Sequence, residues 1–251
     1  MPDHSIPAGA AFIGCAGNSI GRDLAPEFPG QGSHLERYAR VLTCTEINSS
    51  FYRPHQNATY ARWAASVPPG FRFSVKAPRT ITHDARLVEV DALIDAFHGQ
   101  VRHLEEKLGC VLVQLPPKLA FDADVAAAFF SAMQARFDCM LACEARHPSW
   151  FDAGATHLLT AAGVTRVIAD PAQGQPGPHV PTTAAIYTRL HGAPRIYYSS
   201  YPDDYLARLS AQIDAARVAG RQAWCIFDNT ASGAATANAL AVQRALAPPP
   251  P

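Results

Sequence analysis

The sequence predicts a single-domain α/β protein with the fold of a TIM (β/α)8-type barrel. Three observations favour this fold class: a length of 251 residues, an apolar fraction of 48%, and repeated alternation of short apolar runs with helical stretches. Barrels of this type typically need about 250 residues and form one domain. Their sheet is covered by helices, so a strand is apolar on both faces rather than on alternate residues.

Eight short runs have the length and composition of buried strands. They are Ala11–Cys15, Cys44–Asn48, Arg72–Ala77, Cys110–Leu115, Met140–Glu144, Arg166–Ala169, Ile186–Leu190 and Ala223–Phe227. The helical stretches between and after them are His34–Leu42, Tyr60–Ser66, Asp91–Leu108, Asp124–Arg136, Thr156–Ala162, Leu206–Ala219 and Gly233–Leu246. Ser33 stands before the first helix and is its expected N-cap. The alternative is an open doubly wound sheet, but residues 14–18 lack the Gly-rich loop typical of that fold.

The barrel domain is expected to span residues 1–247. The tail Pro248–Pro251 is expected to be disordered or extended, and Pro171–Pro181 is expected to be a long loop within the domain. Basic and acidic residues number 21 each, so the net charge is zero. This balance disfavours a general electrostatic grip on nucleic acid or on an anionic membrane, although it permits a local cationic pocket.

Location and redox state are predicted from the apolar segments and the cysteines. The sequence has no run of roughly 18 apolar residues and no signal-peptide pattern, which predicts a cytoplasmic protein without membrane contact. Six cysteines lie in or beside apolar runs. Free cysteine behaves as a small hydrophobe, so we expect buried free thiols rather than disulfides or a zinc site.

Ionisable and amide side chains stand where nearly every predicted strand ends. In TIM barrels the C-terminal strand ends and the loops after them form the active site. Burying such groups is unfavourable unless they pair with each other or bind something. The predicted catalytic residues are Glu46, Lys76, His83 and Glu144, and the predicted ligand-binding residues are Asn18, Asn48, Gln114, Arg146, Asp170, Arg189, His191 and Asn229. The alternative interpretation is a purely structural lattice of ion pairs in the barrel mouth.

A set of segments along the chain resembles the DUF72 (YecE-like) family. The segments are Glu46–Arg53, Phe71–Lys76, Ile81–His83, Leu108–Gly109, Gln114–Pro117, Glu144–His147 with Trp150, Arg189–Gly192, and Asn229 through Asn238–Ala239. The resemblance covers residues 12–239 and implies a TIM barrel, but it implies no particular reaction. Two features depart from the family pattern: Cys15–Ser19 replaces an aromatic-rich turn, and Asp228-Asn229 replaces a pair of asparagines, which adds a carboxylate.

The favoured hypothesis is an enzyme or binding protein for a small anionic ligand, phosphorylated or carboxylated. Barrels often bind phosphate after strands seven and eight, where this chain has Arg189, His191 and the segment 229–233 opening a helix. Lys76 and Arg146 add positive charge. Glu46 and Glu144 would then serve as general acid and base.

Two other classes of function remain open at this point. A divalent-metal isomerase or hydrolase would use Glu46, Glu144, Asp170 and His191, but these residues show no metal-binding spacing, so no metal ligand is assigned. A non-catalytic nucleic-acid or protein-binding module would use aromatic residues near the strand ends: Phe51, Tyr52, Trp150, Tyr197 and Tyr198. Neutral net charge disfavours nucleic acid. The sequence indicates neither a cofactor nor an oligomeric state.

Overall fold

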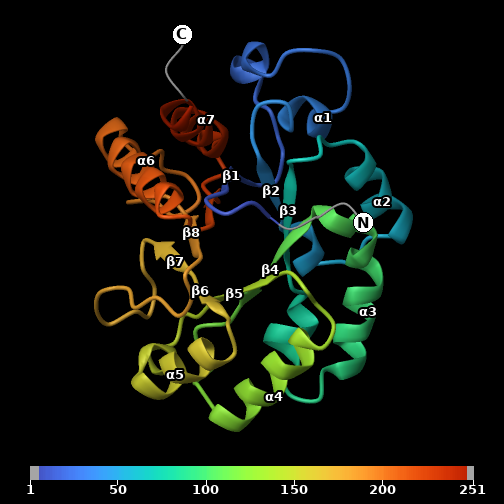
Figure 1. Cartoon of the computed structure of the whole chain (residues 1–251), viewed down its shortest axis with the longest axis vertical. Helices are drawn as coiled ribbons and strands as arrows, with labels where there is room; N and C mark the ends of the chain where they lie inside the picture. The colour runs from blue at the N-terminus through green and yellow to red at the C-terminus, as the bar shows by residue number, and fades with distance from the viewer. Residues whose placement is uncertain (1–5, 248–251) are drawn as a thin grey trace.

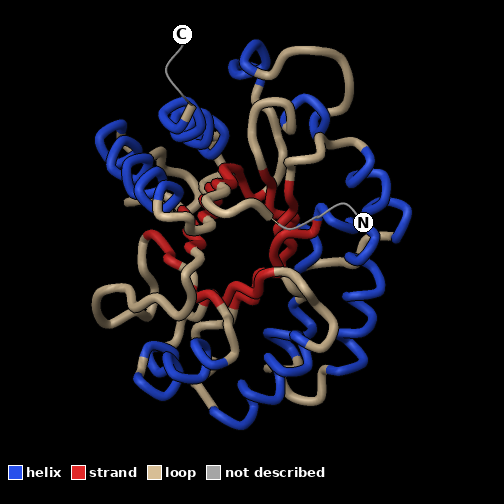
Figure 2. The backbone as a smooth tube through the Cα atoms, viewed as in Figure 1, coloured by secondary structure: helices blue, strands red, loops and turns tan. Residues whose placement is uncertain are grey.

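Nine parallel strands curve into a nearly closed barrel (Figures 1 and 2). The computed structural model describes residues 6–247, so the predicted tail Pro248–Pro251 lies outside the described residues. The order of neighbouring strands is β6-β5-β4-β3-β2-β1-β9-β8-β7. The strands are β1 (Ala11–Ala16), β2 (Cys44–Ile47), β3 (Arg72–Lys76), β4 (Leu108–Gln114), β5 (Met140–Glu144), β6 (Thr165–Arg166), β7 (Ile168–Asp170), β8 (Ile186–Leu190) and β9 (Ala223–Phe227).

Strands β6 and β7 together fill one position of the barrel. Only Val167 separates them, and its N–H donates a hydrogen bond to the Cys143 carbonyl at 3.0 Å. Strand β6 pairs with β5, whereas β7 pairs with β8. The barrel wall therefore has the eight strand positions that the sequence predicts. The predicted sixth strand, Arg166–Ala169, is divided at Val167, because the residues before it pair with β5 and those after it pair with β8.

Seven α-helices of the described chain lie outside the strand ring (Figure 1). They are α1 (His34–Tyr38), α2 (Asn57–Ala65), α3 (Asp91–Val101), α4 (Ala123–Gln134), α5 (Ala153–Ala161), α6 (Asp203–Val218) and α7 (Ala234–Leu246). The predicted helix Asp91–Leu108 is interrupted: α3 passes into the 3-10 segment η4 (Arg102–Lys107), in which Glu105 has a positive φ of 52°. In the described chain, no helix lies between β7 and β8. The connection contains the predicted loop Pro171–Pro181.

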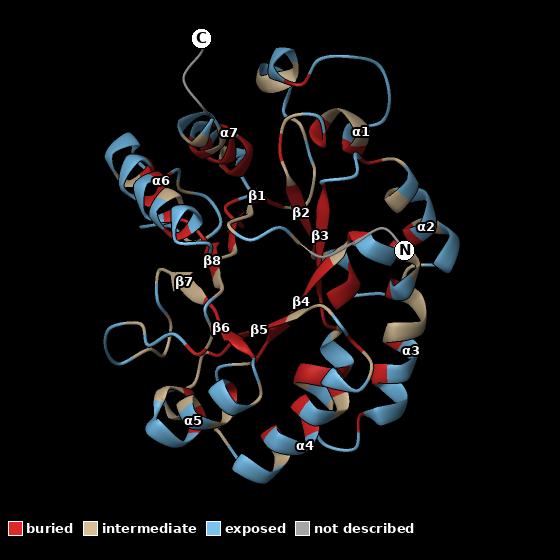
Figure 3. Cartoon of the chain, viewed as in Figure 1, coloured by how far each residue is buried: buried red, intermediate tan, exposed pale blue. Residues whose placement is uncertain are grey.

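The buried apolar side chains form two groups, one inside the barrel and one outside it. The interior group fills the lower part of the barrel and comprises Phe12, Cys44, Cys110, Leu112, Ala142, Val167, Tyr187, Trp224 and Ile226. The larger group packs the outer strand faces against the helices, which present their buried faces to the sheet (Figure 3). Gly14 lies where a side chain would meet the Cys44 backbone carbonyl at 1.9 Å, so only glycine fits there. The apolar floor leaves polar side chains at the C-terminal strand ends.

The cysteines and the helices bear on the predictions about redox state and membranes. All six cysteines are free thiols, and five of them are buried. Within residues 6–247, no helix combines the length and the apolar character needed to cross a bilayer. Cytoplasmic location stays a prediction.

Ser33 caps α1 as the sequence predicts. Its hydroxyl accepts a hydrogen bond from the Glu36 N–H at 3.3 Å, and the Glu36 carboxylate accepts one from the Ser33 N–H at 2.7 Å. We expect Ser33→Ala to lower the free energy of unfolding by about 1 kcal/mol, because an N-terminal N–H of the helix loses its acceptor. Urea unfolding measures this change, and Ser33→Asp should restore most of it because aspartate also caps helices. Equal stability of the alanine variant and the wild type would contradict the prediction.

Candidate functional site

Charged side chains from five strands meet at the C-terminal mouth of the barrel. We call this group the mouth cluster: Glu46, Lys76, Glu144, Arg146, Arg189, His191 and Asp228. Alternation along each strand explains why they meet, since residues two apart share a face of the sheet. On β8, Tyr187 belongs to the interior group, so Arg189 follows it into the barrel. The sequence predicted all of this cluster except Asp228, which it noted only as an added carboxylate.

Arg189 lies at the centre of the mouth cluster and is 1% exposed. Its guanidinium donates two hydrogen bonds to Glu46, from Nε at 2.9 Å and from Nη2 at 2.6 Å. Nη1 donates to Glu144 at 3.0 Å, and Nη2 lies 3.1 Å from Asp228. Burial alone would lower the pKa of Arg189, but the three carboxylates outweigh burial and raise it. Arg189 is thus enclosed by protein carboxylates, and its predicted role in ligand binding stays a prediction.

His191 joins two of these carboxylates. Its Nδ1 lies 3.0 Å from Asp228 and its Nε2 lies 3.2 Å from Glu144. Burial would lower the pKa of His191, but the hydrogen bonds to Asp228 and Glu144 outweigh burial and raise it. With both ring nitrogens facing acceptors, the doubly protonated imidazolium satisfies both contacts.

Glu144 is shared among three cationic side chains. Besides Arg189 and His191, it accepts hydrogen bonds from Arg146 at 3.2 Å and 2.9 Å. Burial would raise the pKa of Glu144, but these cations outweigh burial and hold it well below its ordinary value. Glu144 is therefore an ionised acceptor near neutral pH rather than a proton donor.

Two neutral side chains beneath the cluster were not predicted. Tyr187 donates a hydrogen bond to Glu46 at 3.0 Å, and its hydroxyl lies 2.8 Å from that of Ser74. Strand alternation could have identified them, because Tyr187 lies two residues before Arg189 and Ser74 lies two residues before Lys76, so each pair shares a face of the sheet. Gln114 sits beside this group, since β4 pairs Gln114 with Glu144.

Lys76 differs from the other members of the mouth cluster. Its side chain is buried, with the residue 6% exposed, and its ammonium lies 4.3 Å from the centre of the Phe51 ring. Among the described residues, no carboxylate or carbonyl forms a hydrogen bond or ion pair with it. Burial, with a smaller effect from Arg189, lowers the pKa of Lys76 from 10.5 to about 8.

His83 also contacts Phe51. The two rings meet edge to face at 4.9 Å, and Nδ1 of His83 lies 2.8 Å from the Thr82 hydroxyl. Burial and the nearby charges of Lys76 and Arg79 lower the pKa of His83, so its ring is neutral near neutral pH. The predicted pair Lys76 and His83 thus contacts one aromatic side chain, Phe51.

The remaining predicted site residues lie outside the mouth cluster. Asn18 and Asn48 line a cavity of about 230 Å³ beside β2, where the buried Oδ1 of Asn48 has no hydrogen-bond partner among the described residues. Asp170 accepts hydrogen bonds from the Tyr201 and Tyr205 hydroxyls at 3.0 Å and 2.7 Å.

Asn229 follows β9 and contacts the loop between β8 and α6. Its Nδ2 donates to the Ser199 carbonyl and to Asn238, both at 2.9 Å. The segment 229–233 provides no side-chain cap for α7, whose N-cap residue is Gly233. These contacts give Asn229 a role in holding the β8–α6 loop, and ligand binding by Asn229 stays a prediction.

The geometry also bears on the two alternative functions. The Asp170 carboxylate is engaged by the Tyr201 and Tyr205 hydroxyls. Residues 6–247 contain no cluster of three or more His, Cys, Asp or Glu side chains suited to a metal ion. The aromatic residues divide by exposure: Phe51 and Trp150 are buried, whereas Tyr52, Tyr197 and Tyr198 are exposed.

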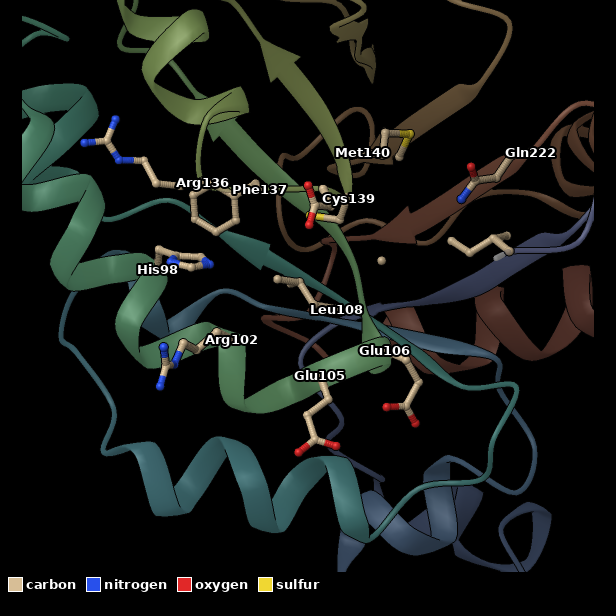
Figure 4. Close-up of a pocket in the computed structure, with 13 residues that line it drawn as sticks. His98, Arg102, Glu105, Glu106, Leu108, Arg136, Phe137, Cys139, Met140 and Gln222 are labelled. Carbon is tan, nitrogen blue, oxygen red and sulfur yellow. The ribbon is translucent and has the colours of Figure 1, made fainter. Parts of the chain in front are cut away.

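Larger cavities lie at the opposite end of the barrel, where the strands begin. One has a volume of about 470 Å³; in Figure 4, His98 and Arg102 line it on one side, and Cys139 and Met140 on another. A second, of about 590 Å³, lies beside the start of β1. Size alone does not mark a site, because in TIM barrels the chemistry lies at the C-terminal ends of the strands. The mouth cluster is therefore the stronger candidate.

Comparison with known proteins agrees with this architecture. The family described as "Protein of unknown function DUF72" matches residues 12–250. The chain is 31% identical over 142 residues to UPF0759 protein YecE of Escherichia coli K12, and 26% identical over 146 residues to UPF0759 protein YunF of Bacillus subtilis 168. These alignments cover 54% and 56% of the chain, which spans about half the length (52%) of each of these curated relatives.

Two solved structures share the fold over nearly the whole chain. A DUF72 family protein of Thermotoga maritima has a TM-score of 0.77 at 23% identity, covering 94% of this chain and 98% of that one. A DUF72 family protein of Enterococcus faecalis has a TM-score of 0.77 at 22% identity, covering 94% and 95%. Because the family match extends over almost all of the described barrel, the chain belongs to the DUF72 family.

Proposed function

We propose that the protein binds a small anionic ligand, phosphorylated or carboxylated, at the mouth of the barrel, and that Lys76 receives the anion. One observation carries this proposal: among residues 6–247, Lys76 is a buried cation that contacts the Phe51 ring but has no hydrogen-bonding or ion-pairing partner. Burying an unpaired charge is strongly unfavourable, and a bound anion would supply the missing partner.

The balance of charge in the mouth cluster supports the same proposal. Three carboxylates, those of Glu46, Glu144 and Asp228, all lie against Arg189. When His191 is protonated, four cationic side chains face these three carboxylates, so one positive charge is left over. A lattice that neutralised itself would include every cation, whereas this lattice leaves out Lys76.

His83 and Glu144 complete the proposed chemistry. We assign the role of general base to His83, because its ring is neutral near neutral pH and contacts the same Phe51 ring as Lys76. Glu144 and Glu46 hold Arg189 and His191 in place, which fixes the electrostatic field around a bound anion. Arg146 is partly exposed and can turn toward a ligand.

Calorimetric titration with glycerol 3-phosphate and with glycolate tests the proposal. At low ionic strength the wild type is expected to bind at least one of the two, and Lys76→Met is expected to weaken that binding by about tenfold or more, as loss of a charged contact does. Lys118→Met is the matched control, because Lys118 is exposed and lies outside the cluster. Absence of binding to the wild type, or equal binding by Lys76→Met, would contradict the proposal.

A further inference from the structure

We propose that Lys76 is a nucleophile that forms an imine with a small anionic aldehyde or ketone at the mouth of the barrel. The inference rests on the proposed function, because it requires an anion to bind there, and it adds the class of substrate. It is argued from the surroundings of the three lysines of this chain, Lys76, Lys107 and Lys118.

Lys107 shows how this fold accommodates another buried lysine. It is as buried as Lys76, each residue being 6% exposed. Its Nζ donates a hydrogen bond to the Pro68 carbonyl at 2.8 Å and lies 3.7 Å from Glu106. Burial therefore does not by itself leave a lysine without partners.

Lys76 lacks such partners although carboxylates stand close by. Glu46, Glu144 and Asp228 all influence its charge, yet each is engaged by Arg189 instead. The lysine ammonium instead faces the Phe51 ring, and its Nζ is not among the fully enclosed polar atoms. Burial and the neighbouring Arg189 favour the neutral amine that attacks carbonyl carbon, and together they outweigh the three carboxylates, which favour the ammonium.

The lowered pKa of Lys76 is consistent with this geometry. Burial and Arg189 lower its pKa from 10.5 to about 8, so a substantial share of the amine is neutral just above neutral pH. Desolvated lysines with lowered pKa values are the ones that form Schiff bases with carbonyl compounds. The positive charge of Arg146 and His191 near the carbonyl would stabilise the oxygen as it gains electrons.

The proposed step balances without any oxidant or reductant. The lone pair of neutral Lys76 forms a C–N bond to the carbonyl carbon, and the C=O electron pair moves to oxygen, which takes up a proton. The nitrogen loses a proton to neutral His83, whose ring contacts the same Phe51 side chain as Lys76. The protonated His83 then gives this proton to the carbinolamine hydroxyl, which leaves as water. The nitrogen lone pair forms the C=N bond, and the resulting protonated imine restores a positive charge beside the anionic group of the bound molecule.

Reductive trapping tests the inference on the whole chain. The protein is incubated near neutral pH in the presence of cyanoborohydride. The aldehyde is either glyoxylate, which is anionic, or formaldehyde, which is uncharged and the smallest aldehyde. Peptide mass mapping then measures the adduct on each lysine. We expect Lys76 to react at least about tenfold faster than exposed Lys118, because burial lowers the pKa of Lys76 to about 8. Lys107 should remain unmodified because its amine is hydrogen-bonded.

Lys76→Arg separates this inference from the proposed function. Arginine keeps the positive charge and should still bind glycolate, the hydroxyl analogue of glyoxylate, but it cannot form an imine. Glycolate binding by the wild type together with a Lys76 adduct no faster than that of Lys118 would overturn the imine and leave the anion site standing. Failure of the wild type to bind glycolate or glycerol 3-phosphate, with no preferential adduct, would overturn both.

Discussion

Replacing Arg189 with methionine is expected to lower the free energy of unfolding by about 3–5 kcal/mol near neutral pH. The substitution leaves Glu46 and Glu144 as buried carboxylates without their shared cation, and it removes four contacts of 2.6–3.1 Å. Breaking a buried ion pair on one side is strongly destabilising. Here Glu46 is affected most, because only the Tyr187 hydroxyl would remain to it, whereas Glu144 keeps Arg146 and His191. Urea unfolding is the suitable measurement, since urea does not screen charges.

The same variant has a defined pH dependence. In the wild type, Arg189 helps to hold the pKa values of Glu144 and Asp228 below their ordinary 4.5 and 3.8. The folded state therefore binds fewer protons than the unfolded state in this range, and the resulting stability is present above these values and lost in acid. The difference between wild type and Arg189→Met should accordingly be largest above pH 4.5 and shrink below pH 3.8.

Arg189→Lys provides the control if the methionine variant does not fold. Lysine keeps the charge but cannot form the two-pronged contact with Glu46, so its loss of stability should fall between zero and that of methionine. A difference between wild type and Arg189→Met below about 1 kcal/mol would show that the cluster contributes little to stability, which is the typical value for exposed ion pairs.

The second large effect has the opposite sign: Lys76→Met is expected to stabilise the protein by about 1–3 kcal/mol near neutral pH. Methionine has a similar length and carries no charge, so it relieves the burial of an unpaired ammonium. The lost contact with the Phe51 ring offsets part of this gain. Urea unfolding again measures the change.

The pH window of this effect follows from the lowered pKa of Lys76. The pKa of Lys76 is about 8 in the folded protein and ordinarily 10.5, so the unfolded state binds more protons between these values. Wild-type stability due to Lys76 therefore rises with pH across this window. The advantage of methionine should be full below pH 8 and vanish toward pH 10.5. The groups facing Lys76 are Glu46, His83, Glu144, Arg189 and Asp228, and all remain in both proteins.

Lys107→Met is the matched control for this prediction. Lys107 is equally buried, but its ammonium is hydrogen-bonded to the Pro68 carbonyl. Removing it should lower the free energy of unfolding by about 1 kcal/mol, because a hydrogen bond is lost. Destabilisation by both methionine substitutions would indicate that Lys76 has a partner in solution and would remove the basis for an anion site.

Much of the fold could be predicted from local sequence patterns. The runs Met140–Glu144, Ile186–Leu190 and Ala223–Phe227 coincide with β5, β8 and β9. Helix ends were less well predicted, because they depend on backbone breaks such as the positive φ of Glu105. The split between β6 and β7 was not predicted, because it depends on pairing across the sheet: β6 pairs only with β5, and β7 pairs only with β8.

The site could be predicted only as a set of residue types. Alternation along β9 places Asp228, two residues after Ile226, on the inner face, and this signal was present in the sequence. The pairing of Arg189 with Glu46 was not visible, because the two residues lie 143 positions apart. The residues next to Arg189 in the sequence do not indicate which carboxylate it will pair with in the closed barrel.

The sequence by itself determined the barrel, the apolar floor and the polar side chains at the strand ends. It did so because hydrophobic periodicity is local and each strand carries its own pattern. Only the tertiary structure decided that Arg189 pairs with the three carboxylates and that Lys107 is hydrogen-bonded to Pro68, whereas Lys76 has no such partner within residues 6–247. Ion pairing and desolvation depend on distances across the closed barrel, which no short stretch of sequence contains.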